Sequence, residues 1–459
     1  MAALISIDMG NHMTDLQASS WTASADDYFF VLGRDRGVSL ERRPDWILKR
    51  APGATVRQYV CSAYPQIRSV LEQNIEHRWT RIKPAIFEIN AVPVRARDVV
   101  FRGGSAEVGG KCLLNGAAGD RVYTRFLKNN RGMENFRRSN QFFARAREET
   151  RLDLPEEGSF PKGMRVAIEC RNRRNFYHFM TEALPQLVHF DDRSPSEIVF
   201  HCRNNDPSGF AGKFIEAFFP DLAGLVEFTD RRASYDDVLI PFTFRHMIYS
   251  NGDPMLTRML DETGEDTAWQ DIGAHVRRRK FAFKNSYDVS MRLLRERVLS
   301  MIDPKLIAAM PKKIWVSRDN RSDAVNSRQM YGEDALVARL KREGFEQMHF
   351  EHLTPHEQVA AVHAADVIGS FHGAFFGHLM FARSDAHVIE VGSVQTQLHR
   401  WGDFLGNAHV AGCRYSKVYA DVASKNPEKI RPIADGLVGV RVAPAAIDFI
   451  TRLATEGQV

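Results

Sequence analysis

Three short, largely apolar runs in the last third of the chain constrain the fold most. They are KIWV at 313–316, VIGSF at 367–371 and HVIEV at 387–391, and small or polar residues end or follow each one. Short apolar runs of this kind are typical of buried parallel strands, and parallel sheets bind ligands at the carboxyl ends of their strands. The sequence therefore predicts an α/β domain with a ligand site at the ends of these strands.

The residues that follow the first two runs favour an anionic ligand. Arg318 can meet a phosphate as a charge-assisted donor, and Ser317, Arg321 and Arg328 lie on the same predicted loop. After the second run, the turn at His372-Gly373-Ala374 lets backbone N–H groups approach a phosphate closely. A helix expected from Ala374 adds the positive end of its dipole.

Other polar residues nearby have two interpretations each. Glu390 lies in the third run, where its carboxylate either accepts hydrogen bonds from ribose hydroxyls or caps a helix. Glu357 and Gln358, in the first turn of a predicted helix from Pro355, either support the donor side of the site or supply favourable charge at a helix amino end.

Strand and helix signals divide the chain into four regions. Residues 1–84 form an N-terminal extension of unknown role, although a helix is expected over 64–77, and residues 85–160 read as β-hairpins. Residues 161–303 alternate between strand and helix patterns, as do residues 304–459, and the prolines at 304 and 311 suggest a linker. The pattern predicts two α/β units with a cleft between them and a terminal helix from Pro444.

A polar stripe marks the helix predicted from Asn175 to Phe190. Asn175, His178, Glu182, Gln186 and His189 recur at spacings of three and four, which places His178 beside Glu182. A carboxylate one turn from an imidazole fixes its tautomer and raises its basicity, as a general base requires. The alternative is a solvated polar face; the position of the helix, after the first strand of its domain, favours a site.

Several motifs are absent from the sequence. No D-x-D pair is available to hold a metal on a nucleotide, no G-x-G-x-x-G follows a strand, and no G-x-S-x-G nucleophile elbow occurs. The glycines between Gly104 and Cys112 have the wrong spacing for a phosphate-binding P-loop. Hydride transfer, ATP hydrolysis and serine hydrolysis are therefore disfavoured, and we expect neither a metal nor a bound cofactor.

Composition sets further limits. With 62 Lys+Arg and 57 Asp+Glu the formal net charge is +5, which gives little support for a nucleic-acid partner. Five scattered cysteines without a C-x-x-C pair favour reduced thiols and a cytoplasmic location. No apolar stretch is long enough to span a membrane, whereas peripheral attachment to the inner membrane remains open, as does the oligomeric state.

The motifs, taken together and in order, resemble glycosyltransferase family sixty-one. They are NFYHFMTEALP at 175–185, WVSR at 315–318, RQMYGEDAL at 328–336, EQ at 357–358, HGA at 372–374 and VIEV at 388–391. This family includes bacterial capsular polysaccharide enzymes, plant xylan arabinosyl- and xylosyltransferases and an animal O-mannose glycan enzyme. The resemblance covers roughly residues 165–391, with two departures: Gly332 replaces the usual Asn, and Phe375–His378 replaces a smaller, Thr- and Asn-containing segment.

The resemblance implies a GT-B-like fold, in which two Rossmann-like domains face each other across a cleft. It also implies inverting, metal-independent sugar transfer from a nucleotide-sugar donor to a polysaccharide or glycan acceptor. His178 and Glu182 would then be catalytic, with Asn175 on the acceptor side. The donor would be held by Ser317, Arg318, Arg321, His372, Gly373, Ala374 and Glu390.

Two alternatives remain. A polysaccharide pyruvyltransferase also has two α/β domains and cationic residues for an anionic donor. A noncatalytic glycan-binding or assembly protein that retained the fold is the other, suggested by the departures at Gly332 and His378.

Overall fold

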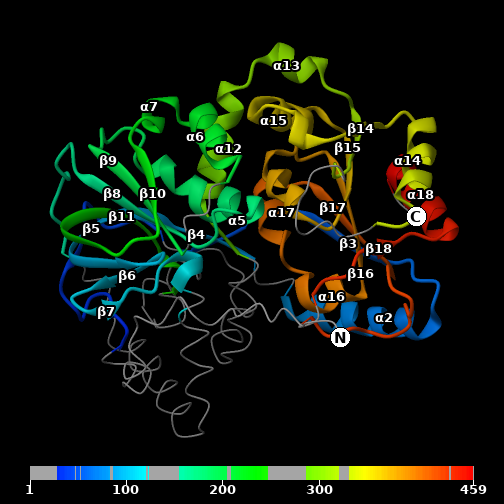
Figure 1. Cartoon of the computed structure of the whole chain (residues 1–459), viewed down its shortest axis with the longest axis horizontal. Helices are drawn as coiled ribbons and strands as arrows, with labels where there is room; N and C mark the ends of the chain where they lie inside the picture. The colour runs from blue at the N-terminus through cyan, green and yellow to red at the C-terminus, as the bar shows by residue number, and fades with distance from the viewer. Residues whose placement is uncertain are drawn as a thin grey trace, which may run out of the picture. The chain divides into compact units, whose positions relative to one another are not determined.

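The computed structural model describes residues 28–46, 48–51, 53–82, 86–119, 122, 155–203, 208–246, 286–319, 330–433 and 436–457. The chain forms two units, Met1–Leu48 with Ile89–Gly264 and Lys49–Glu88 with Glu265–Val459 (Figure 1). The predicted N-terminal extension is thus divided between the units, and Pro304 lies within the second one. Arg321 and Arg328 lie outside the described residues.

A mixed sheet of eight strands organises the first unit, in the order β10-β9-β8-β11-β5-β6-β7 with β1 paired to β5. Its strands are β1 (Val38–Leu40), β5 (Ala91–Arg102), β6 (Ser105–Val108), β7 (Lys111–Cys112), β8 (Arg165–Cys170), β9 (Glu197–Cys202), β10 (Val226–Thr229) and β11 (Ala233–Thr243). The pairs from β10 through β9 and β8 to β11 are parallel, whereas β11, β5, β6 and β7 pair antiparallel. Both the predicted hairpins and the predicted alternation are confirmed.

The helix predicted after β8 is irregular. It consists of α5 (Phe176–His178), the π-helical η2 (Phe179–Ala183) and the 3-10 helix η3 (Leu184–His189). Pro185 lies in the first turn of η3, where its missing N–H and rigid ring disfavour a regular α-helix. Phe179, Ala183 and Leu187 are buried, as the wheel predicts. After β9 come α6 (Ala211–Phe218) and α7 (Pro220–Ala223), and η4 (Phe244–His246) follows β11.

A seven-stranded, mainly parallel sheet organises the second unit. Its order is β14-β13-β15-β16-β17-β18, with β3 also paired to β17. The strands are β3 (Thr55–Val60), β13 (Lys313–Val316), β14 (Glu346–Met348), β15 (Val367–Phe371), β16 (His387–Ser393), β17 (Arg414–Val422) and β18 (Val440–Arg441). Only β18 pairs antiparallel within this sheet. The α/β class predicted from the three apolar runs is confirmed.

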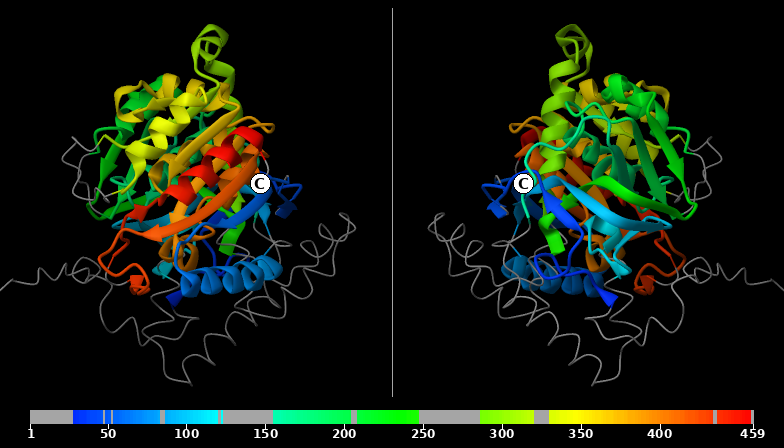
Figure 2. Two further views of the ribbon diagram at one scale, coloured as in Figure 1. Left: turned by 90° about the vertical axis from the view of Figure 1, so that its right-hand side faces the viewer. Right: turned by 90° about the vertical axis from the view of Figure 1, so that its left-hand side faces the viewer.

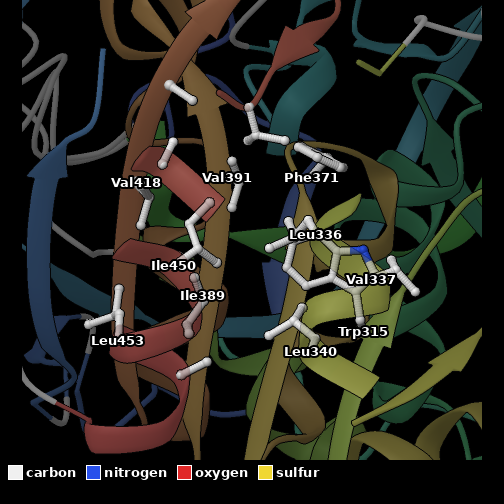
Figure 3. Close-up of a cluster of buried hydrophobic side chains, with 14 of the residues drawn as sticks. Trp315, Leu336, Val337, Leu340, Phe371, Ile389, Val391, Val418, Ile450 and Leu453 are labelled. Carbon is white, nitrogen blue, oxygen red and sulfur yellow. The ribbon is translucent and has the colours of Figure 1, made fainter. Parts of the chain in front are cut away.

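Two helices, α14 (Glu333–Arg342) and α18 (Pro444–Glu456), cover one face of this sheet (Figure 2). The core beneath them includes Trp315, Leu336, Leu340, Phe371, Ile389, Val391, Val418, Ile450 and Leu453 (Figure 3). Gly369 lies next to Trp315 because a Cβ there would be 2.5 Å from the indole ring. Alternation along β16 therefore directs Glu390 to the opposite face from Ile389 and Val391.

The remaining helices of the second unit follow the chain around its sheet. They are α2 (Pro65–Ile82), α12 (Val289–Met301), α13 (Pro304–Ala309), η5 (Phe350–His352), α15 (Pro355–Ala364), η6 (Ala374–Phe381), α16 (Val394–Arg400) and α17 (Leu405–Ala411). A small separate sheet contains β2 (Leu48–Arg50), β4 (Phe87–Ile89) and β12 (Tyr287–Asp288).

Residues near the amino terminus complete the second sheet. β3 runs parallel to β17, some 350 residues away in the sequence, and Figure 1 shows the two strands adjacent. The Ser62 hydroxyl donates to Asp421 Oδ1 over 2.6 Å, which fixes the turn between β3 and α2 against the end of β17. Residues that had no predicted role thus belong to the fold of this unit.

Candidate active-site residues

In the first unit, the predicted pair of His178 and Glu182 is in contact. Asn175 accepts a hydrogen bond from the His178 backbone N–H and begins α5 as its N-cap. Glu182 Oε1 lies 2.8 Å from His178 Nδ1. The two side chains are 25% and 21% exposed, so both can be reached from solvent.

Arg171, which follows β8 directly, joins this pair. Its guanidinium donates to Glu182 Oε1 and also lies 3.2 Å from His178 Nε2. Since a guanidinium only donates, the carboxylate is the shared acceptor, and the Nδ1 contact is best satisfied by an Nδ1–H of His178. The Nε2 lone pair then remains for a substrate proton, although Arg171 competes for it.

The pKa of Glu182 reflects opposing effects. Burial raises it, but the charges of His178 and Arg171 and the hydrogen bond from His178 outweigh burial, and the pKa lies below its ordinary value. Glu182 is therefore ionised at neutral pH and can stabilise an imidazolium on His178.

A pocket of about 20 Å³, enough for one water molecule or one hydroxyl group, opens beside this pair. Its lining includes Glu169, Arg171, Glu182, Gln186 and Thr243. Glu169, at the end of β8, accepts from the Ala106 N–H over 3.0 Å, while its Oε2 has no partner among the described residues. Burial raises the pKa of Glu169 well above its ordinary value. One protonated and one ionised carboxyl group thus lie on the same pocket.

In the second unit, the strand ends bring Arg318 to the H-G-A turn. A Cβ added to Gly373 would lie 2.4 Å from Arg318 Nη2, so the guanidinium packs directly on the glycine backbone. Gly373 has a φ of −179°, which any residue adopts; the close approach, not the backbone conformation, requires glycine. Ala374 begins η6 next to this contact.

Arg318 keeps its hydrogen-bonding capacity. Within the described ranges its guanidinium makes neither a hydrogen bond nor an ion pair closer than 4 Å. Burial lowers its pKa, opposed by the more distant charges of Glu351 and Glu333. A partly buried cation with unused donors suits an anionic ligand.

His372 and Glu390 form a buried pair behind this contact. Glu390 Oε1 lies 2.5 Å from His372 Nδ1, and the side chains are 2% and 6% exposed, respectively. Glu390 Oε2 accepts from Tyr415 and lies 3.2 Å from Lys417 Nζ. Burial raises the pKa of Glu390, but Lys417 and His372 outweigh it and hold this pKa at about 2. Both carboxylate oxygens are thus engaged within the protein.

The other predicted donor-side residues make contacts that shape the fold. Ser317 donates to Glu333 over 2.7 Å and accepts from Gln347 over 3.1 Å. Glu357 closes a capping box with Thr354 at the start of α15, which is the alternative interpretation of this residue. Gln358 donates to the carbonyls of Phe350 and Leu353, each over 2.9 Å, and so holds the loop before α15.

The two departures from the family pattern have packing explanations. Gly332 has a φ of 83°, and a Cβ there would lie 2.4 Å from the Val442 carbonyl oxygen, so side chains are disfavoured twice. His378 is buried and packs on Phe350 with a ring-centroid distance of 5.2 Å. Burial lowers the pKa of His378 to about 3, which keeps its ring neutral.

Two searches concern chemistry beyond these clusters. Across the described part of the chain, no group of three or more His, Cys, Asp or Glu side chains is arranged to hold a metal ion. Within the same residues, no helix has the length and apolarity needed to cross a membrane. All five cysteines are free, as predicted.

These α/β units, with a His–Glu pair in one and a free arginine at a strand end in the other, define a protein suited to group transfer involving an anionic substrate. Residues 176–389 match the family model Glycosyltransferase 61, and the chain belongs to this family. It is therefore a glycosyltransferase by family, with a sugar donor and a glycan acceptor as its substrates. A comparison with curated proteins gave no match.

Sequence reasoning did not identify four of the clustered residues. Arg171 was recognisable only as a charge after β8, and Glu169 only as a strand residue. Tyr415 and Lys417 lie on β17, a strand that the sequence did not predict. The strand end at Arg171 was the one usable signal, since loops after parallel strands carry ligand sites.

Proposed function

We propose that the chain is an inverting, metal-independent glycosyltransferase of GT-B architecture that uses a nucleotide-sugar donor. The observation that carries this proposal is the packing of the Arg318 guanidinium on Gly373, with its donors unused by the described residues. A diphosphate fits this arrangement, because a guanidinium fork and exposed backbone N–H groups both bind phosphate oxygens.

On the donor side, Arg318 and the turn of His372, Gly373 and Ala374 bind the diphosphate, with Arg321 assisting. When the bond between the sugar carbon and the phosphate oxygen breaks, the leaving group gains negative charge. Arg318 stabilises this charge, which is the part a divalent cation would otherwise take. Glu390, buried with both oxygens engaged, orients His372 in this proposal, and the ribose is held by other groups.

On the acceptor side, His178 removes the proton of the attacking hydroxyl. The hydroxyl oxygen forms a bond to the sugar carbon, the proton moves to His178 Nε2, and Glu182 stabilises the imidazolium. Glu182 is the alternative base, since its Oε2 has no partner among the described residues. Asn175 contributes by fixing the start of α5 and by its exposed position next to His178.

The setting of the reaction follows the family resemblance. We propose a surface or extracellular polysaccharide, or a related glycan, as the acceptor. A cytoplasmic location agrees with five free cysteines.

The test is a transfer assay with full-length protein and a panel of UDP-, GDP- and CMP-sugars, read by mass spectrometry with and without EDTA. We expect turnover of one donor, unaffected by EDTA, and a product of inverted anomeric configuration by NMR. Arg318→Met should abolish donor binding, whereas His178→Gln should abolish turnover and leave donor binding intact.

Phosphoenolpyruvate belongs in the same panel. Turnover of phosphoenolpyruvate instead of a nucleotide sugar would identify a pyruvyltransferase. Nucleotide binding without hydrolysis or transfer, for every donor and a broad set of glycan acceptors, would identify a noncatalytic glycan-assembly protein.

A further inference from the structure

A buried charge cluster lies behind His372 and takes no direct part in the proposed chemistry. Glu390 on β16 and Lys417 on β17 are register partners, and Tyr415 lies two residues before Lys417 on the same face. Glu390, Lys417 and Tyr415 are 2%, 1% and 0% exposed. Such burial of an ion pair is costly unless its groups are fully hydrogen-bonded.

The hydrogen bonds of the cluster assign the proton positions. Lys417 lies 3.2 Å from Glu390 Oε2 and donates to the Trp401 carbonyl. Tyr415 donates to the same carboxylate, and burial raises the pKa of Tyr415, so its hydroxyl stays neutral. Glu390 Oε1 therefore accepts from an Nδ1–H of His372. His372 Nε2 has no partner within the described ranges.

The charge count of the cluster sets the state of His372. The Glu390 carboxylate is already balanced by the Lys417 ammonium, and the Arg318 guanidinium lies at the adjacent Gly373. A second proton on His372 would add an uncompensated charge beside another cation. The imidazole also packs on the uncharged ring of Phe404, 4.9 Å between centroids, which offers no counter-charge. Glu333 and Glu351 act on Arg318 only.

We propose that His372 takes up a proton when it binds a phosphate group, with Glu390 and Lys417 as positioning residues that set this coupling. The proton comes from solvent and binds Nε2, which then donates to a phosphate oxygen; no bond of the ligand breaks. An anion at this point supplies the counter-charge that the free cluster lacks. The inference rests on the proposed diphosphate site and adds its dependence on pH.

Lys417 has a role opposite to that of an ordinary binding residue. With Lys417 present, the carboxylate is neutralised and the free imidazole stays uncharged. Removing the ammonium leaves Glu390 as the sole counter-charge for His372, which should then hold two protons without any ligand. Removing the carboxylate has the reverse effect, because nothing then fixes the Nδ1 proton.

The experiment uses full-length protein labelled with ¹⁵N-histidine, with inorganic pyrophosphate as the probe. Two-bond ¹H–¹⁵N spectra at pH 8 report the protonation of each ring nitrogen, and the His372 signals are assigned by their loss in His372→Gln. We expect free His372 to carry a proton on Nδ1 alone and the complex to carry protons on both nitrogens. Saturating pyrophosphate without this change, or no binding of pyrophosphate, overturns the proposal.

Three variants separate charge from structure, through the pH dependence of pyrophosphate affinity by calorimetry. Wild-type affinity should fall by up to about tenfold per pH unit across the coupled range. Lys417→Met should shift this fall to higher pH and show doubly protonated His372 without ligand, whereas Glu390→Gln should abolish the fall. Tyr415→Phe, which removes a hydrogen bond but no charge, is the matched control and should keep the wild-type slope.

An equal loss of affinity in all three variants, with unchanged slopes, would indicate a merely structural cluster and overturn the proposal. The wild-type spectra decide the matter even where a variant fails to fold. Failure of the proposed glycosyltransferase function would appear separately, as absence of turnover in the donor panel.

Discussion

Gly373→Ala tests the contact on which the donor site depends. The new Cβ would lie 2.4 Å from Arg318 Nη2, about 1 Å closer than an ordinary contact, so the guanidinium must withdraw. The backbone tolerates alanine, because φ is −179°. The substitution therefore moves one cation and leaves the strand and η6 in place.

The expected effect on binding follows from the hydrogen bonds that Arg318 would lose. A hydrogen bond to a charged group contributes about 1.5–3 kcal/mol, so pyrophosphate or nucleotide affinity should fall roughly ten- to hundredfold. The free energy of unfolding should change by less than about 1 kcal/mol. Calorimetric titration and urea unfolding measure the two quantities on the same samples.

Two controls make the result specific. Gly53→Ala, in the same unit and with nothing within 4 Å of the new Cβ, should leave affinity unchanged. Combined with Arg318→Met, Gly373→Ala should cause no further loss, because both act on one guanidinium. Unchanged affinity in Gly373→Ala, or additive losses in the double variant, would refute the reasoning.

Three further predictions concern stability and turnover. Because burial raises the pKa of Glu169 in the folded protein, its stabilising effect is complete below the ordinary value of 4.5 and declines above it, by about 1.4 kcal/mol per pH unit until the folded-state pKa is reached. Glu169→Gln should therefore gain stability relative to wild type as pH rises from 6 to 8 in urea unfolding, and a constant difference would contradict this. Gly332→Ala should cost at least about 2 kcal/mol, and more than Gly344→Ala, which has the same positive φ but no neighbour within 4 Å; equal costs would exclude the clash with Val442. His178→Gln should lower turnover at least about a hundredfold with donor affinity retained, and a smaller loss would assign the base elsewhere.

Local patterns predicted much of the fold. The apolar runs at 313–316, 367–371 and 387–391 became β13, β15 and β16, because strands buried on both faces need continuous apolar sequence. The charged strand β17 was missed. Its Lys417 and Asp421 suggest an exposed segment, yet each is matched by a partner distant in sequence, Glu390 and Ser62.

The site was predictable where it depends on spacing. His178 and Glu182 meet because residues four apart share a helix face, although the helix itself departs from α geometry after one turn. Arg318 and Gly373 meet because neighbouring parallel strands end at the same edge. Their roles in binding and catalysis remain predictions.

Burial was what the sequence could not provide. Glu390 was predicted to face a ribose, but the register of β16 and β17 engages both of its oxygens within the protein. Glu169 gave no signal, because its high pKa depends on burial at the end of β8.

The most direct test of the central claim is a thermal-shift screen of wild type and Arg318→Met against UDP-, GDP- and CMP-sugars. A donor that binds only the native state raises the melting temperature. We predict that a diphosphate sugar, UDP- or GDP-linked, raises the wild-type melting temperature and leaves that of Arg318→Met unchanged. Equal shifts in both proteins, or no shift with any donor, would contradict a diphosphate site at Arg318.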